Sequence, residues 1–312
     1  PEKLEQASNF ANKIWNAAKF VINNIPDVEK VKEVGKNPHD LKIEDKWILN
    51  KLNKLVKEVT RNIENYDLGI ALDKIYAFIW NEFCDWYIEM AKSRIYSEDE
   101  NEKIAVSYVL NHVLGISMKL LHPFMPFVTT EIYDSIAKND DTELMISAWP
   151  EVKEEFEYEQ EEKIIEEIKD VITEIRNVRS TKNIHPSKKS EIIVVTKQDN
   201  SELKEIIPIF MKLGFASEVK IQDSKDNIPE NSIHIIVDDI EIFMPLAGLI
   251  DEEEEKNRIE AEKNRLHSEI ARCEKMLSNP GFISKAPQAK IDEEKAKLEK
   301  YKEMLKSIEE NP

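Results

Sequence analysis

The chain contains few of the residues on which many enzymes and secreted proteins depend. It has two cysteines and six glycines among 312 residues. Cys84 and Cys273 lie far apart in sequence and suggest neither a disulfide framework nor a zinc site. The sequence contains no GxGxxG motif and no P-loop, and no histidine has a partner at metal-ligand spacing. The residues alone therefore predict a chain without a catalytic site or bound metal, from a reducing cytoplasm.

Long apolar runs are also absent. No run of 18 apolar residues occurs, so we expect no membrane span. The chain opens on PEKLEQ, without a basic segment followed by an apolar one, so we expect no signal peptide. It also lacks an initiator methionine and opens directly on a helical pattern, so we expect a segment of a longer protein. What the chain has in abundance is charge, with 34% charged residues and a net charge of −18. An acidic body attracts RNA weakly at long range, so any RNA contact must be local.

Helical patterns dominate residues 1–150. The stretch 66–94 is apolar at three- and four-residue steps around most of a helix circumference, which predicts the buried central helix of a bundle. Four further helices are expected around it, at about 2–22, 41–64, 97–121 and 124–137. The sequence therefore predicts a five-helix bundle over residues 1–150.

The first of these helices has two stripes. The apolar stripe is Leu4, Ala7, Ala11, Ile14, Trp15, Ala18, Val21 and Ile22. The second stripe is Asn9, Lys13, Asn16 and Phe20, spaced i, i+4, i+7 and i+11 on one face. Amides, a cation and an aromatic ring can read base edges and stack on an unpaired base. The same spacing also fits a solvated helix face with one aromatic against a neighbour, and spacing alone leaves both interpretations open.

Residues 151–248 have a different character. A long helix with an acidic start and a basic end is followed by β-branched runs of period two, which predict a small βαβββ subdomain. The predicted strands are 191–196, 218–221, 232–237 and 241–244, with a helix at 201–213. The end of the long helix gathers the most basic cluster of the chain: Arg176, Arg179, Lys182, Lys188 and Lys189. These cations either complement the helix dipole or contact an RNA backbone.

Residues 249–312 repeat apolar side chains every seven residues. The repeats are Ile259, Leu266 and Cys273, then Ile291, Leu298 and Leu305. With a Pro-Gly break between them, they predict an antiparallel coiled-coil hairpin. Arg258, Arg265 and Arg272 flank one seam. They can pair with glutamates of the hairpin or contact RNA, and charge spacing does not decide between the two.

Several segments resemble the anticodon-binding domain of class I aminoacyl-tRNA synthetases. They are NFANKIWNA at 9–17, FCDWYIE at 83–89, and LHPFMPF at 121–127 with Glu131. In the tail, NPGF at 279–282 and KAP at 285–287 lie inside the heptad hairpin, which is similar to the C-terminal coiled coil of valyl-tRNA synthetases. An isoleucyl relative often ends in a cysteine-bound zinc module, for which this chain has no cysteines.

The resemblance implies a division of labour. Lys13, Asn16 and Phe20 match family positions that contact anticodon bases, Phe20 by stacking, and the coiled coil would contact the outer corner of tRNA(Val). The parent would be a monomeric, cytoplasmic valine–tRNA ligase whose catalytic and editing domains precede this segment. ATP and magnesium would be used in the catalytic domain, and no cofactor in this segment. The alternatives are the same segment of an isoleucyl- or leucyl-type relative, or a helical scaffold whose coiled coil recruits a protein.

Overall fold

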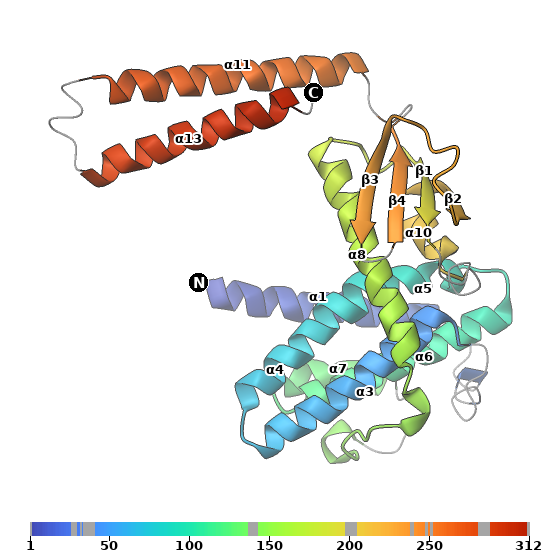
Figure 1. Ribbon diagram of the computed structural model, residues 1–312. Helices are drawn as coiled ribbons and strands as arrows, with labels where there is room; N and C mark the ends of the chain where they lie inside the picture. Colours follow the sequence, from blue (N-terminus) through green and yellow to red (C-terminus); the bar gives the residue numbers. More distant parts are fainter. Residues whose placement is uncertain are drawn as a thin grey trace. The chain divides into compact units, whose positions relative to one another are not determined.

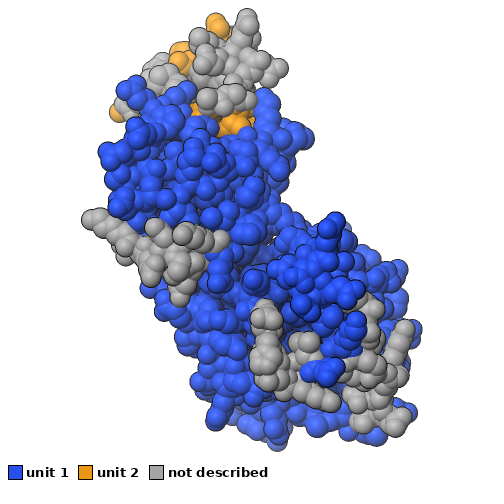
Figure 2. All heavy atoms as spheres, turned by 90° about the vertical axis from the view of Figure 1, so that its right-hand side faces the viewer, with its two compact units in different colours: residues 1–181, 185–245 blue, residues 182–184, 246–312 orange. Residues whose placement is uncertain are grey.

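The computed structural model describes most of the chain, and its side chains except at a few helix ends. The described residues are 2–25, 30–31, 33, 41–136, 143–196, 205–237, 240–246, 249, 252–279 and 288–310. They form two compact units, residues 1–181 with 185–245 and residues 182–184 with 246–312 (Figures 1 and 2). A helical bundle, a small mixed sheet and a helical hairpin confirm the predicted fold class. The finer division at residue 150 stays a prediction.

Five helical rods build the bundle in the first unit (Figure 1). Four of them are α1 (Glu2–Asn24), α3 (Ile43–Glu64), α6 (Glu100–Leu121) and α7 (Pro126–Ile136). The fifth is a continuous rod made of α4 (Leu68–Ala77), η1 (Phe78–Tyr87) and α5 (Ile88–Ile95). This rod packs against α1, α3 and α6, as a central helix should.

The central rod differs from its prediction in two ways. Its middle segment, η1, is a π-helix, whose wider turn is rare and is frequently found at functional sites. Its first segment is not buried all round, since Leu68 and Ile70 are each 51% exposed. The prediction of uniform burial is therefore wrong for α4 and right for the inward face of η1 and α5, where Phe83 and Tyr87 are buried.

Helix α6 is long and apolar enough to cross a membrane by length and composition. However, 67% of its most apolar window is buried within the bundle. Val106, Val113 and Leu120 have no exposed surface. A helix enclosed by its neighbours in this way is a core helix, and we interpret α6 as one.

Helix α8 (Glu159–Thr181) connects the bundle to the sheet (Figure 1). Its first half packs on α3, and its second half packs on the strands. The short helices η2 (Leu144–Ile146) and η3 (Glu154–Phe156) precede it. The sheet contains β1 (Ser190–Val195), β2 (Ala216–Gln222), β3 (Ser232–Val237) and β4 (Ile240–Pro245) in the order β2-β1-β4-β3.

The sheet has one parallel and two antiparallel pairings. Strand β2 returns parallel to β1 after the helix α10 (Ile207–Leu213), while β4 is antiparallel to both β1 and β3. This is the predicted βαβββ order. The residues buried on α8 include Ile168, Ile172 and Ile175, spaced on one helix face, so the helix covers the bundle and the sheet with one apolar stripe.

In the second unit, α11 (Glu252–Leu277) and α13 (Gln288–Glu310) pack against each other as a hairpin. Leu266, Cys273 and Ile291, three of the predicted heptad residues, are buried at the seam. The Cys273 thiol contacts Glu294 at 3.5 Å. Residues 280–287, which include the Pro-Gly pair of the predicted break, lie outside the described residues.

Candidate nucleic-acid interface

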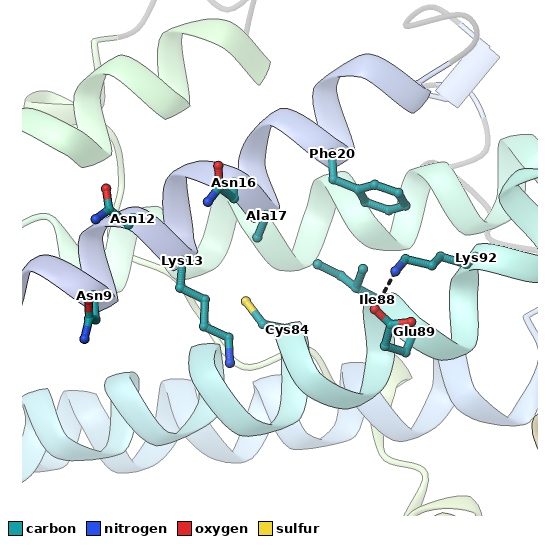
Figure 3. A pocket seen from close by; sticks show the side chains of 10 residues that line it. All are labelled: Asn9, Asn12, Lys13, Asn16, Ala17, Phe20, Cys84, Ile88, Glu89 and Lys92. Carbon is teal, nitrogen blue, oxygen red and sulfur yellow. Dashed lines mark hydrogen bonds and ion pairs between the residues drawn. The ribbon is translucent and has the colours of Figure 1, made fainter. Parts of the chain in front are cut away.

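The four residues predicted on the second stripe of α1 line a single pocket. Asn9, Lys13, Asn16 and Phe20 face the end of η1 and the start of α5 across a hollow of about 500 Å³ (Figure 3). Asn12 and Ala17 complete the α1 wall, and the opposite wall is Cys84, Ile88, Glu89 and Lys92. The structure therefore brings the predicted residues together on an open surface, and they do not face away from one another.

The rotation of α1 about its axis is set by its core residues. Phe10, Ile14, Ala18 and Val21 are at most 4% exposed, and they turn the polar stripe toward the pocket. Two details of the predicted apolar stripe are wrong. Phe10 is missing from it, and Trp15, which it includes, is 37% exposed on another face of the helix. The error arises because each residue along a helix turns the side-chain direction by about 100° around the axis, so that neighbouring residues lie on different faces.

Three aromatic rings support the α1 side of the pocket. Phe10 lies 4.5 Å from Tyr76 and 6.4 Å from Trp80, measured between ring centroids. The Lys13 ammonium lies 3.8 Å above the Trp80 ring and 2.5 Å from the Asp85 carboxylate. Lys13 therefore does not extend freely into solvent, because a ring and a carboxylate of η1 hold it at the pocket wall.

Phe20 lies at the other end of the pocket, half-buried, opposite Ile88 and Lys92 (Figure 3). The Lys92 ammonium is 5.7 Å from the Phe20 ring centroid and 2.5 Å from the Glu89 carboxylate. Nearby, Asn24 donates a hydrogen bond of 2.7 Å to the Phe20 carbonyl, which closes the last turn of α1. One face of the ring is therefore supported by protein, and a flat ligand can stack in the hollow beside it.

The remaining lining groups are neutral or hydrogen-bonding. Burial raises the pKa of the Cys84 thiol to about 12, so Cys84 presents a neutral thiol at neutral pH. Asn9, Asn12 and Asn16 are exposed, and each offers an amide donor and acceptor. The pocket thus combines an apolar floor, amides, two amine–carboxylate pairs and one ring. This is a suitable set for an unpaired base and contains no nucleophile paired with a base.

The π-helix η1 is fixed from its other side as well. Lys169 of α8 donates to Glu82 at 2.6 Å, and Arg176 lies 5.3 Å from the Trp86 ring centroid. Glu82 and Trp86 face α8, whereas Asp85 and Cys84 face α1. One segment therefore joins the pocket to the long helix that reaches the sheet.

Two arginines of the basic cluster at the end of α8 have partners inside the fold. Arg179 is 3% exposed, and its guanidinium donates to the carbonyls of His185 and Lys188. Arg176 is partly buried and donates to the Leu213 carbonyl at 3.1 Å. The prediction of an RNA-backbone contact is wrong for Arg179, because the side chain is buried and its two terminal nitrogens donate inside the fold. Arg176 likewise donates to a backbone carbonyl and is partly buried, so less of its guanidinium is available to RNA.

The other backbone candidates belong to the second unit. Lys182 is half-buried. Arg265 and Arg272 are exposed on α11, and Arg272 pairs with Glu269 at 2.8 Å. The side chain of Arg258 lies outside the described residues. For Arg272, the alternative of pairing within the hairpin is therefore present in the structure, and a role in RNA contact stays a prediction.

Among the residues that the structure describes, no group of three or more histidine, cysteine or carboxylate side chains could hold a metal ion. The acidic residues instead pair with lysines across helix interfaces, as Glu162 does with Lys54 at 2.9 Å. Hydrogen bonds, stacking and local charge are the interactions that the side chains lining the pocket offer to an RNA ligand.

Comparisons with known proteins match this architecture. Residues 45–194 match a family described as the anticodon-binding domain of tRNA ligase, and residues 251–311 match the valyl tRNA synthetase tRNA binding arm. The chain is 44% identical over 310 residues to the valine–tRNA ligase of Clostridium acetobutylicum, covering 99% of this chain and 35% of that protein. It is 45% identical over 307 residues to the Clostridium tetani enzyme, covering 98% of this chain and 34% of that protein.

The bundle and the hairpin thus define the tRNA-recognition class of aminoacyl-tRNA synthetase modules. Its two matched segments are the anticodon-binding domain of a tRNA ligase and the tRNA binding arm of a valyl-tRNA synthetase, and the chain spans about a third of the length of the valine–tRNA ligases that it matches. The predicted resemblance is confirmed. The tail, whose motifs resembled those of valyl-tRNA synthetases, matches the family model of the valyl tRNA synthetase tRNA binding arm.

Sequence reasoning finds one wall of the pocket and misses the other. Cys84, Ile88 and Glu89 lie within a segment that carries the family resemblance, but the sequence predicts no role for them. It singles out neither Asn12 nor Lys92. Asn12 lies just beside the α1 stripe, and the other four residues lie far from it in sequence, so no local pattern connects them to the stripe. Only the packing of α1 on the central rod brings the two walls together.

Proposed function

We propose that this chain is the tRNA-holding segment of a valine–tRNA ligase, and that the pocket between α1 and α5 binds unpaired anticodon bases of tRNA(Val). The observation that carries the proposal is the gathering of Asn9, Lys13, Asn16 and Phe20 around one open pocket. Phe20 stacks on a base, and the amides of Asn9 and Asn16 read base edges. The Lys13 ammonium donates to a base acceptor.

The opposite wall supplies complementary groups. The Glu89 carboxylate accepts hydrogen bonds, and exocyclic amino groups such as that of cytosine are suited to donate them. Lys92, paired with Glu89, keeps the local charge near balance. This arrangement explains how an acidic chain binds RNA: contact is made by stacking and base-edge hydrogen bonds in the pocket, and less by long-range attraction to phosphate.

The proposal extends to the parent enzyme. Its catalytic domain would use ATP and magnesium to activate valine and attach it to the tRNA, while the hairpin α11–α13 would contact the outer corner of the tRNA. We place the enzyme in the cytoplasm as a monomer. Arg265 and Arg272 are the described hairpin residues proposed to face the RNA backbone, and Arg258 and Lys182 belong to the same proposal.

The test compares two aromatic residues of one helix. Phe20→Ala should weaken binding of a tRNA(Val) anticodon stem–loop by about 1–3 kcal/mol, because it removes a stacking platform. Trp15→Ala is the matched control, since Trp15 is also exposed on α1 but does not line the pocket. Fluorescence anisotropy with labelled stem–loops measures both variants.

A stem–loop with altered anticodon bases should bind the wild type more weakly. In the full-length ligase, Phe20→Ala should lower tRNA charging and leave ATP–pyrophosphate exchange intact, since the latter needs no tRNA contact here. Equal losses for Phe20→Ala and Trp15→Ala, or equal losses in both enzyme assays, would reject the proposed role of Phe20.

A further inference from the structure

The Lys13 ammonium is the cation of the α1 stripe, and in this structure it already has an anionic partner. Its partners both come from the π-helix η1, with Asp85 at 2.5 Å and the Trp80 ring centroid at 3.8 Å. The Lys13 side chain is 24% exposed, while that of Asp85 is 50% exposed. Asp85 therefore stands at the surface beside the pocket, with its carboxylate paired with the Lys13 ammonium.

This pairing affects which ligands Lys13 can bind. A lysine ammonium is a compact charge that attracts any phosphate, whatever the sequence of the RNA. A carboxylate 2.5 Å away neutralises that attraction and repels an approaching phosphate. The ammonium has three donors, so one that points into the pocket can still bond to a neutral acceptor on a base.

We propose that Asp85 is a specificity-determining residue. Asp85 holds Lys13 against Trp80 and masks the Lys13 charge from phosphates. The affinity of the pocket for an RNA then depends on the base that enters it and less on the phosphate charge that every RNA carries. This inference rests on the proposed function of the pocket. The remaining charged groups of the pocket are Glu89 and Lys92, which pair with each other on α5 and leave Lys13 and Asp85 as a separate pair.

The test measures discrimination between two RNA stem–loops, one with the valine anticodon and one with altered anticodon bases. In Asp85→Asn, the altered loop should bind about tenfold tighter than it binds the wild type, because one lysine–phosphate contact is unmasked. Its salt dependence should steepen by roughly 0.7–0.9 in the slope of log K against log salt. Binding of the valine loop should change by less than about twofold, so the ratio of the two affinities falls.

Asp73→Asn is the matched control. It removes one exposed carboxylate from α4 of the same rod, outside the pocket, and changes net charge equally. It should shift both loops alike and leave their ratio unchanged. Asp85→Glu keeps the negative charge and should retain discrimination, which separates charge masking from a packing role. Circular dichroism verifies that each variant is folded.

The outcomes separate this inference from the proposed function. If the wild type does not distinguish the two loops, the proposed function and the role of Asp85 are both overturned. If the wild type distinguishes them and Phe20→Ala weakens binding, but Asp85→Asn keeps the wild-type ratio, the pocket function stands. In that case only the role of Asp85 is overturned.

Discussion

The polar stripe of α1 and the basic end of α8 look alike in sequence and differ in the folded protein. The α1 stripe has one cation and two amides, the end of α8 has a cluster of cations, and for both the sequence allows RNA contact. On α1, Asn9 and Asn16 remain exposed at the rim of a pocket. On α8, Arg179 is 3% exposed and bonded to backbone carbonyls.

The difference shows what decides whether a polar residue is available to a ligand. A buried polar group must find partners inside the protein, because leaving it unpaired costs about 1–3 kcal/mol or more if it is charged. Arg179 finds those partners in the turn that leads from α8 to β1. The amides of Asn9 and Asn16 on α1 are exposed and stay open to solvent. Burial therefore separates the structural cation Arg179 from the exposed polar side chains that a ligand can reach.

The largest expected effect is on stability, and it concerns Arg179. Arg179→Met should lower the free energy of unfolding by about 2–3 kcal/mol, because it removes charge-assisted hydrogen bonds to the carbonyls of His185 and Lys188 and leaves those carbonyls with fewer donors. The folded variant should bind the anticodon stem–loop as the wild type does. Urea unfolding followed by circular dichroism measures the first quantity, and anisotropy measures the second.

Lys189→Met is the control for this substitution. Lys189 is exposed directly before β1, and the substitution removes the same charge. It should leave the unfolding free energy almost unchanged. If Arg179→Met kept full stability and instead weakened RNA binding, the assignment of Arg179 to the structural class would be wrong.

A second prediction concerns buried carboxylates that, like Arg179, have their partners inside the fold. Glu44 and Asp45, at the start of α3, pair with Arg94 at 3.1 and 2.6 Å, and Tyr87 donates to Asp45 at 2.7 Å. Burial raises the pKa of Glu44 to about 7, and the neighbouring Asp45 charge adds to the rise, while Arg94 opposes it. In the folded protein, Glu44 thus holds a proton at pH values where an unfolded chain would release it.

The sign of the pH dependence follows from that proton. Because the folded pKa is above the ordinary value of 4.5, the contribution of Glu44 favours folding at low pH and is lost as the pH rises through about 7. As the pH rises from 4.5 to about 7, the free energy of unfolding of the wild type should fall by about 1–3 kcal/mol relative to that of Glu44→Gln, because glutamine cannot titrate. Urea unfolding at several pH values measures the difference, and parallel curves for the two proteins would contradict the raised pKa.

Much of the fold could be predicted from periodicity, and the site only in part. The five rods, the individual strands and the heptad hairpin each leave a local repeat in the sequence. The α1 wall also lies within one repeat. The opposite wall does not, since Ile88 and Glu89 follow a π-helical segment, η1, that changes the direction in which every later side chain points relative to a regular 3.6-residue pattern.

The fate of the cations could not be predicted for a similar reason. The partners of Arg179 are backbone carbonyls of a turn, and backbone groups carry no sequence signal. The partners of Lys13 are Trp80 and Asp85, and which helix faces α1 is a property of packing. The sequence shows that a helix face is polar, but neighbouring elements decide whether that face is open, masked or buried.

The hairpin provides an intermediate case, with the smallest expected effect. Arg265 and Arg272 are exposed, like the α1 stripe, yet Arg272 also has a partner within its own helix, Glu269. Exposed ion pairs contribute little to stability and exchange readily, so the fold does not depend on such an arginine in the way that it depends on Arg179. The double variant Arg265→Gln/Arg272→Gln should therefore leave the unfolding midpoint of the hairpin almost unchanged.

Its effect should appear in the salt dependence of binding to full-length tRNA(Val). If both arginines contact phosphates, the slope of log K against log salt should become shallower by up to about 1.8 in magnitude, because each contact accounts for roughly 0.9. The control is Lys290→Gln/Lys300→Gln, which removes two exposed charges from α13. Both variants should bind the isolated anticodon stem–loop as the wild type does. An unchanged slope, or equal slopes for the two double variants, would assign these arginines to the hairpin's own ion pairs and leave the α1 pocket as the described site that contacts RNA.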